Sequence, residues 1–166
     1  QVIPVLLGKD HDIIGQAQTG TGKTAAFSLP IVQKITPGLK KVQALVLCPT
    51  RELAIQVADE IKTFCPGRGI TTLTVYGGAP VQDQRRALKK GVDIVVATPG
   101  RCIQFLENGA LDLADLQYLV LDEADEMLNM GFVEDVEKIL KATPEERTVL
   151  MFSATMPPRL KKIAES

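Results

Sequence analysis

Short apolar runs rich in β-branched residues alternate with amphipathic stretches along this chain. The apolar runs lie near residues 12–15, 43–48, 71–76, 93–97, 117–122 and 148–152. Strands and helices that alternate in this way are typical of a parallel sheet with helices on both faces, because a crossover between parallel strands usually contains a helix. The pattern therefore predicts an α/β fold.

The sequence also indicates where several helices lie. Residues 51–65 show the helical period well, with apolar side chains on one face at Ala54, Val57, Ala58, Ile61 and Phe64. Pro30 is expected to interrupt and kink an earlier helix, because proline lacks a backbone N–H. A basic cluster on another short helix is expected to be a solvated face, and it consists of Arg85, Arg86, Lys89 and Lys90.

One segment carries the chemistry of a phosphate-binding loop. It reads Ala17-Gln18-Thr19-Gly20-Thr21-Gly22-Lys23-Thr24 and lies between an apolar strand candidate and a stretch of helical character. Its glycines allow successive backbone N–H groups to turn toward one phosphate, and the helix N-terminus adds a positive dipole. The lysine can reach the β and γ phosphates of ATP, and the threonine hydroxyl can bind Mg²⁺. The small Ala17 stands where the usual pattern has its first glycine.

A second segment complements this loop. The apolar strand from Leu116 to Leu121 delivers Asp122 at its carboxyl end, where a carboxylate can hold Mg²⁺. The adjacent Glu123 is then the candidate that orients the attacking water. An isolated Asp-Glu pair is as often an N-cap of the next helix. An upstream phosphate-binding loop strongly favours the ATP site.

Composition narrows the classes of protein further. The chain has 166 residues, 45% of them hydrophobic, and a net charge of −1, so no global basic field attracts nucleic acid. No apolar run is long enough for a bilayer and no signal segment opens the chain, so a cytoplasmic protein without a membrane partner is expected. The solitary His11 is expected in a solvated loop. The three cysteines lack metal-site spacing and are expected to be small core residues: Cys48, Cys65 and Cys102.

Four more turns follow predicted strands. In open parallel sheets, ligands bind beyond the carboxyl ends of the strands, so these turns should gather at one edge. Two of them pass into helices with a threonine at the predicted N-cap and an arginine nearby, which is an arrangement that suits successive phosphates. Ordinary helix capping explains each turn equally well when it is taken alone. The turns contain Pro49, Thr50 and Arg51, then Gly77 and Gly78, then Thr98, Pro99, Gly100 and Arg101, and finally Ser153 and Thr155.

Taken together and in this order, the motifs closely resemble those of the DEAD-box family of ATP-dependent RNA helicases. The resemblance covers the whole chain and includes the name-giving sequence Asp122-Glu123-Ala124-Asp125. It implies a RecA-like first domain that binds ATP and Mg²⁺ and contacts the backbone of single-stranded RNA or an RNA duplex through the turns at 49–51, 77–78 and 98–101. It also implies that Asp125, Ser153 and Thr155 couple hydrolysis to strand separation.

The same resemblance marks what the chain is expected to lack. Gln1 is too close to Ile3-Pro4 to be the family's adenine-reading glutamine. The helix after Pro157-Pro158 stops about two turns in, so a further strand is expected to be missing. The second RecA-like domain, which in the family supplies arginine fingers and half of the RNA site, has no counterpart in residues 1–166. We therefore expect a partial domain that is nearly inactive alone.

Other functions fit part of this pattern. The ATP site alone is equally compatible with a motor that acts on DNA or on protein. An ATP-gated RNA clamp, in which hydrolysis serves only release, would carry the same motifs as an unwinding enzyme. The low aromatic content of 4% agrees with recognition of RNA through its backbone, because proteins that stack on bases use aromatic platforms.

Overall fold

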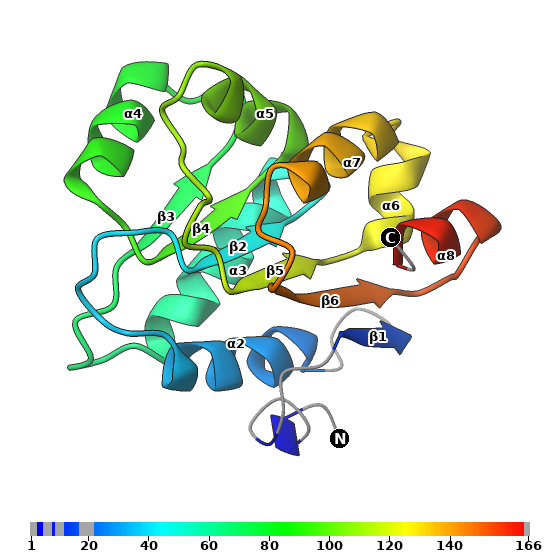
Figure 1. Ribbon diagram of the computed structural model, residues 1–166, viewed down its shortest axis with the longest axis horizontal. Helices are drawn as coiled ribbons and strands as arrows, with labels where there is room; N and C mark the ends of the chain where they lie inside the picture. Colours follow the sequence, from blue (N-terminus) through cyan, green and yellow to red (C-terminus); the bar gives the residue numbers. More distant parts are fainter. Residues whose placement is uncertain (1–2, 5–7, 9–11, 17–21, 165–166) are drawn as a thin grey trace.

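The computed structural model describes residues 3, 4, 8, 12–16 and 22–164 (Figure 1). In this part of the chain, six strands form one sheet in the order β1-β6-β5-β2-β4-β3, and every neighbouring pair is parallel. The predicted apolar runs coincide with these strands, and no boundary differs by more than one residue. The strands are β1 (Ile13–Gln16), β2 (Ala44–Leu47), β3 (Thr72–Val75), β4 (Ile94–Ala97), β5 (Tyr118–Leu121) and β6 (Thr148–Ser153).

Helices cover both faces of this sheet, as predicted. One face packs against α2 (Lys23–Lys34) and α3 (Arg51–Thr63). The other face packs against the remaining helices, which are α4 (Val81–Lys90), α5 (Pro99–Glu107), α6 (Ala124–Asn129), α7 (Val133–Lys141) and α8 (Pro158–Ala164).

Alternate strand residues supply the two cores between these layers. In β2, Ala44 and Val46 pack toward α2 and α3, whereas Leu45 and Leu47 pack toward the opposite helices. All four side chains are fully buried because successive side chains point to opposite faces of a sheet that is covered on both sides. The two apolar layers hold the carboxyl ends of the strands in a fixed register, and these ends carry the motifs.

Helix α3 forms as its sequence predicts. The hydroxyl oxygen of Thr50 accepts a hydrogen bond from the backbone N–H of Leu53 at 3.2 Å, which caps the first turn. The buried face consists of Ala54, Val57, Ala58 and Ile61. Phe64, the fifth residue of the predicted face, caps the helix end and is only partly buried.

Two expectations from the sequence are wrong. Helix α2 continues through Pro30 to Lys34, because burial of Phe27, Ile31 and Val32 compensates for the single backbone hydrogen bond that proline removes. Cys65 is only partly buried at the end of α3, whereas Cys48 and Cys102 are core residues as expected. His11 lies outside the described residues.

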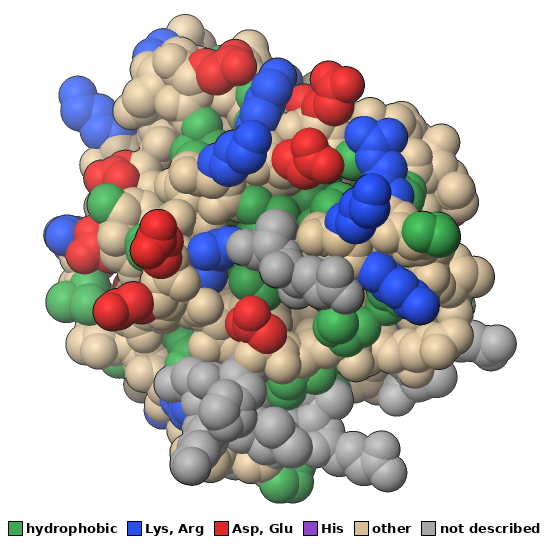
Figure 2. Space-filling view, turned by 45° about the vertical axis from the view of Figure 1, so that its right-hand side comes forward, with side chains coloured by type: hydrophobic (Ala, Val, Ile, Leu, Met, Phe, Trp, Pro, Cys, Tyr) green, Lys and Arg blue, Asp and Glu red, His purple; other side chains and the backbone are tan. Residues whose placement is uncertain are grey.

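The surface carries charges of both signs. On the face that includes α6, α7 and α8, basic and acidic side chains are interspersed (Figure 2), in keeping with the net charge of −1. None of the helices that the structure describes is long and apolar enough to cross a membrane.

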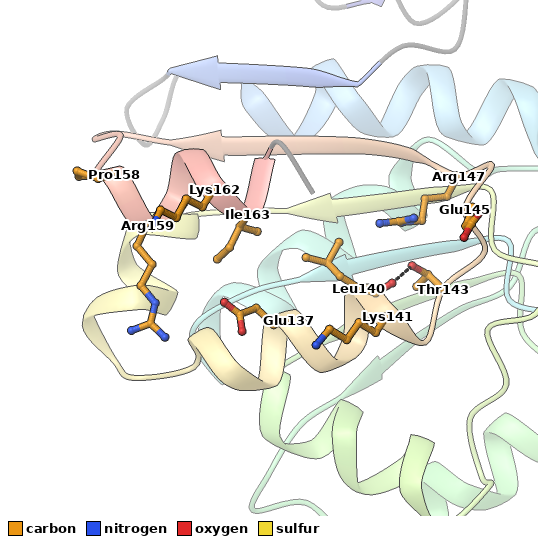
Figure 3. Close-up of a pocket in the computed structure, with 10 residues that line it drawn as sticks. All are labelled: Glu137, Leu140, Lys141, Thr143, Glu145, Arg147, Pro158, Arg159, Lys162 and Ile163. Atoms are coloured by element: carbon orange, nitrogen blue, oxygen red, sulfur yellow. Dashed lines mark hydrogen bonds between the residues drawn. The ribbon is translucent and has the colours of Figure 1, made fainter.

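A cavity of about 830 Å³ separates α7 from α8 (Figure 3). Side chains of the two helices face each other across it, and the loop before β6 closes one end. Its lining contains none of the motif residues, and it consists of Glu137, Leu140, Lys141, Thr143, Glu145, Arg147, Pro158, Arg159, Lys162 and Ile163. This cavity is therefore distinct from the site described next.

Candidate functional site

The sheet gathers the motifs of the described residues at one edge. Each motif begins where a strand ends or within two residues of that end, and all six strands point the same way. The carboxyl ends of parallel strands form the edge at which ligands bind in open α/β sheets. The expectation that separate turns meet at this edge is confirmed.

The phosphate-binding loop is described only at its end. Ala17, Gln18, Thr19, Gly20 and Thr21 lie outside the described residues.

The part that is described forms the start of α2. Gly22 is the N-cap of this helix and has a φ of 77°, a left-handed conformation that glycine adopts without a steric penalty. Lys23 and Thr24 are the first two helical residues. The loop therefore enters the helix at the point where the N–H groups are unpaired and anions bind.

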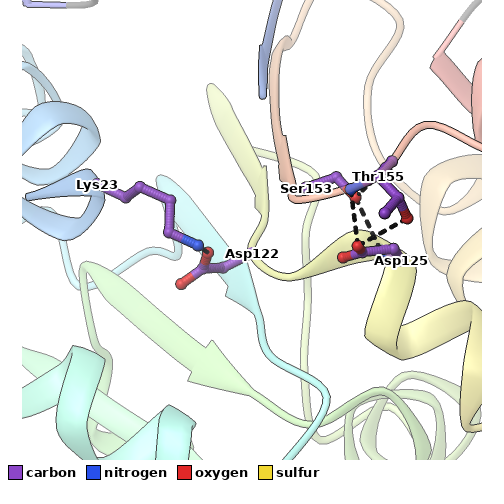
Figure 4. A network of polar contacts seen from close by, with 5 residues as sticks. All are labelled: Lys23, Asp122, Asp125, Ser153 and Thr155. Atoms are coloured by element: carbon purple, nitrogen blue, oxygen red, sulfur yellow. Dashed lines mark hydrogen bonds and ion pairs between the residues drawn. The ribbon is translucent and has the colours of Figure 1, made fainter. Parts of the chain in front are cut away.

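An ion pair joins the loop to the end of β5 (Figure 4). The Lys23 ammonium Nζ lies 3.3 Å from Oδ1 of Asp122, and these side chains are 9% and 3% exposed. Burial raises the pKa of the Asp122 carboxyl above its ordinary value, and the charge of Lys23 opposes this rise. Two segments almost 100 residues apart in sequence thus place a largely enclosed cation beside a buried anion.

The polar atoms here fit a hard divalent cation. Oδ1 of Asp122 is buried and pairs with the Lys23 ammonium, but no donor among the described residues makes a well-aligned hydrogen bond to it, so this oxygen keeps a lone pair for a cation. The described residues hold no cluster of three acidic, histidine or cysteine side chains that would bind a metal unaided. Mg²⁺ is commonly held by one or two protein oxygens together with phosphate oxygens and water, which is the donor set that Asp122 and a nucleotide would provide.

Glu123 has an unusual backbone. It is the N-cap of α6 and adopts a left-handed conformation with φ 52°, yet its side chain makes no capping hydrogen bond. Burial, followed by the nearby charge of Asp122, raises the pKa of the Glu123 carboxyl. A non-glycine residue in this conformation is strained, and such strain often marks a functional site. The alternative that Asp122 merely caps the helix is wrong, because Glu123 holds the N-cap position.

A hydrogen-bond network links Asp125 to the turn after β6. The backbone N–H and the hydroxyl of Thr155 both donate to Oδ2 of Asp125 at 2.9 Å. The backbone N–H of Asp125 donates to Oγ of Ser153 at 3.2 Å, and the Ser153 hydroxyl donates to the Thr155 carbonyl at 2.6 Å (Figure 4). Partial burial alone would raise the pKa of Asp125, but these hydrogen bonds outweigh it and lower the pKa.

The two arginines at helix N-termini lie beside one turn. The Arg51 guanidinium stacks over the Tyr76 ring, 5.4 Å from its centroid. Arg101 donates from Nη1 to the Ala79 carbonyl at 3.3 Å and lies 5.7 Å from the centroid of the Phe105 ring. The turn at 77–78 is thus held between the two segments that the sequence separates by fifty residues.

The backbone of these turns differs in one detail from the prediction. Gly78 has a φ of 86° and needs glycine, and Thr50 caps α3 through its side chain. Thr98 occupies the N-cap position of α5 as predicted, but its side chain makes no capping hydrogen bond. Pro99 and Gly100 form the first residues of that helix.

Three residues near this edge have contacts that the sequence did not predict. The Tyr76 ring lies under the Arg51 guanidinium, and the side chain of Gln84 makes hydrogen bonds to the main chain of Tyr76. Gln16 donates a hydrogen bond from Nε2 to the Ala154 carbonyl at 3.0 Å. A signal exists for Gln84: it is a polar residue at helical spacing between Val81 and Leu88, on the inner face of α4. No comparable signal marks the other two.

This geometry defines a class of protein. A parallel α/β sheet with a Gly-Lys-Thr helix entry, paired through its lysine to an aspartate at the end of a neighbouring strand, is a P-loop nucleotide-binding domain.

Comparison with known proteins gives the family. The family model described as DEAD/DEAH box helicase matches residues 1–163, and the chain belongs to this family. It is 53% identical over 163 residues to the DEAD-box ATP-dependent RNA helicase CshA of Streptococcus pneumoniae serotype 4, covering 98% of this chain and 31% of that protein. It is likewise 53% identical over 164 residues to the ATP-dependent RNA helicase DeaD of Escherichia coli K12, covering 98% of this chain and 26% of the relative. The chain thus spans about a third or less of these curated relatives.

Solved structures agree with the fold. A crystal structure of a DEAD box protein from the hyperthermophile Methanococcus jannaschii matches with a TM-score of 0.94 at 45% identity, covering 99% of this chain and 45% of that one. A hypothetical ATP-dependent RNA helicase from Sulfolobus tokodaii matches with a TM-score of 0.89 at 37% identity, covering 99% and 47%. The RecA-like fold that the sequence predicts is confirmed.

Proposed function

We propose that this chain is the ATP-binding domain of a cytoplasmic enzyme that couples ATP hydrolysis to unwinding of RNA duplexes or remodelling of RNA–protein complexes. The observation that carries the proposal is the ion pair of Lys23 with the buried Asp122, because it brings the phosphate-binding loop and the DEAD sequence into one site. The names of the relatives, which are ATP-dependent RNA helicases, support the choice of RNA.

The nucleotide is held mainly through its phosphates. Residues 17–24 surround them, with Lys23 on the β and γ phosphates. Thr24 and Asp122 hold Mg²⁺, which neutralises charge on those phosphates when it is bound. Glu123 orients the attacking water and accepts its proton, a role that suits a carboxylate whose pKa is raised by burial and by its neighbour Asp122.

RNA lies along the turns that follow β2, β3 and β4. Arg51 and Arg101 neutralise phosphates, and the backbone N–H groups of the turns bind phosphate oxygens. Contacts to the backbone and to the 2′-OH select RNA over DNA without reading the sequence. The contact residues are Pro49, Thr50, Arg51, Gly77, Gly78, Thr98, Pro99, Gly100 and Arg101.

Coupling runs through the network of Asp125, Ser153 and Thr155. These residues tie α6, which begins directly after Glu123, to the turn after β6. A shift of the DEAD segment during hydrolysis is therefore transmitted to this turn. We propose that the turn faces a second RecA-like domain of the same protein, which supplies arginine fingers and completes the RNA site.

The test is phosphate release by the full-length protein. We expect stimulation by single-stranded RNA and little stimulation by DNA of the same sequence. Equal stimulation by both would instead support a motor that acts on DNA, and no ATP turnover under any condition would contradict the proposal. Strand displacement from a short duplex, compared with the lifetime of the ATP-bound RNA complex, then separates an unwinding enzyme from a clamp.

A second measurement tests whether ATP hydrolysis needs the proposed second domain. An arginine finger contributes about 10³ to 10⁵ in rate to phosphoryl transfer. Residues 1–166 alone should therefore bind nucleotide weakly and release almost no phosphate with RNA, whereas the full-length protein should do so readily. Strong RNA stimulation of the isolated segment would show that no second domain is needed.

A further inference from the structure

Arg51 is an exposed residue whose guanidinium nevertheless has a defined place. It stacks on the ring of Tyr76, and Nη1 lies so close to the glycine turn that a Cβ atom on Gly78 would be 3.9 Å from it. A free arginine side chain loses about 2 kcal/mol of rotamer entropy when it binds a phosphate. The aromatic ring reduces this loss, because it holds the planar cation in one orientation before any ligand arrives.

Tyr76 is itself held in place. The side-chain amide of Gln84 accepts a hydrogen bond from the Tyr76 N–H at 3.2 Å and donates one to the Tyr76 carbonyl at 3.1 Å. Gln84 is 6% exposed on α4, and these two hydrogen bonds give both polar atoms of its amide a partner. The pair of hydrogen bonds fixes the residue that joins the end of β3 to the Gly77-Gly78 turn.

The same turn also holds the second arginine. Arg101 donates to the carbonyl of Ala79, immediately after the two glycines. Tyr76 and Ala79 thus flank the turn and contact one arginine each. The spacing between the two guanidinium groups depends on the turn, and the turn depends on Gln84.

We propose that Tyr76 is a positioning residue that preorganises Arg51 for an RNA phosphate, and that Gln84 anchors Tyr76 in that role. This inference rests on the proposed RNA-binding function and deepens it. Tyr76 need not touch RNA, and its effect on affinity passes through Arg51. A tyrosine that only fills space, or one that stacks directly on a base, would behave differently in a double-mutant cycle.

The experiment measures the affinity of the full-length protein for labelled single-stranded RNA with a non-hydrolysable ATP analogue. Tyr76→Leu removes the ring and should weaken binding about two- to fivefold, the effect expected for one exposed cation–π contact. Tyr76→Phe keeps the ring and should restore the affinity. In the Arg51→Ala background, Tyr76→Leu should cause no further loss.

The controls separate the possible failures. Arg68→Ala removes another exposed cation, on a loop before β3 at the opposite edge of the sheet, and should leave RNA affinity unchanged. If the wild-type protein does not bind RNA, the proposed function fails. If it binds RNA but Tyr76→Leu has no effect, or weakens binding equally with and without Arg51, the positioning role is wrong.

The anchor is tested separately by amide hydrogen exchange. Gln84→Leu removes the acceptor of the Tyr76 N–H, so this amide should exchange faster and RNA affinity should fall. Unchanged exchange at Tyr76 in a folded Gln84→Leu protein would overturn the role of Gln84. Circular dichroism melting shows whether each variant is folded. If Gln84→Leu does not fold, Tyr76→Phe and Tyr76→Leu still test the main proposal.

Discussion

Replacement of Lys23 by methionine isolates the electrostatics of the site. Methionine keeps most of the aliphatic length but removes the charge that lies 3.3 Å from Asp122. At an effective dielectric constant of about 20, this attraction amounts to about 5 kcal/mol. The loss leaves a buried carboxylate without its cation, which is strongly destabilising in proteins.

Protonation of Asp122 sets a ceiling on this cost. The carboxyl can always take up a proton, and at pH 7 this costs about 4 kcal/mol relative to an ordinary aspartate with a pKa of 3.8. At pH 5 the ceiling falls to about 1.6 kcal/mol. We therefore expect Lys23→Met to destabilise the protein by up to about 4 kcal/mol at pH 7 and much less at pH 5.

The direction of the Asp122 pKa shift decides how the stability of the protein depends on pH. Because the folded-state pKa of Asp122 is raised above the unfolded value, its contribution to stability is complete below pH 3.8 and is lost as pH rises through the folded pKa. Removal of the Lys23 charge raises that pKa further and extends the loss toward neutral pH.

Urea unfolding at pH 5 and pH 7 measures both values. The double variant Lys23→Met/Asp122→Asn should recover most of the stability at pH 7, because no buried charge remains. The reasoning is refuted if Lys23→Met destabilises the protein equally at the two pH values, or if the double variant is no more stable than the single one.

Three further predictions concern chemistry, coupling and RNA. Glu123→Gln keeps the shape of the side chain but not its basicity. Calorimetry should therefore show unchanged ATP affinity, while the rate of single-turnover hydrolysis should fall about 10²-fold or more. Hydrolysis at the wild-type rate would exclude Glu123 as the catalytic residue. Thr155→Val removes a hydrogen bond that lowers the pKa of Asp125, so it should destabilise the protein by about 1 kcal/mol at neutral pH. This difference should vanish in acid as Asp125 is protonated, and the same loss of stability at low pH would contradict the assignment. Arg101→Ala should weaken RNA binding alike for all sequences and reduce the salt slope by about one unit, whereas a sequence-dependent loss would mean that Arg101 reads bases.

The sequence by itself determined the fold and the family. Short runs rich in β-branched residues that alternate with helical stretches are typical of strands buried between two helical layers, and this pattern placed all six described strands within one residue. Motifs made of consecutive residues could also be identified from the sequence, because the chemistry of a phosphate-binding loop or of an aspartate after a strand depends on near neighbours in the chain. Pro30 shows the limit of such local rules, since packing of the helix around it overrode the effect of the missing N–H.

Only the tertiary structure decided which residues meet. Gln43 and Asp93 are polar residues at the starts of two predicted strands, and only the structure shows that they are buried and hydrogen-bonded to each other just before β2 and β4. Tyr76 and Gln84 carry no motif, and their roles depend on the strand and helix that bring them beside Arg51. A hydrogen bond or a cation–π contact requires an approach of a few ångströms between segments that are far apart in the chain. Local sequence patterns cannot specify such distances, whereas the register of the sheet does.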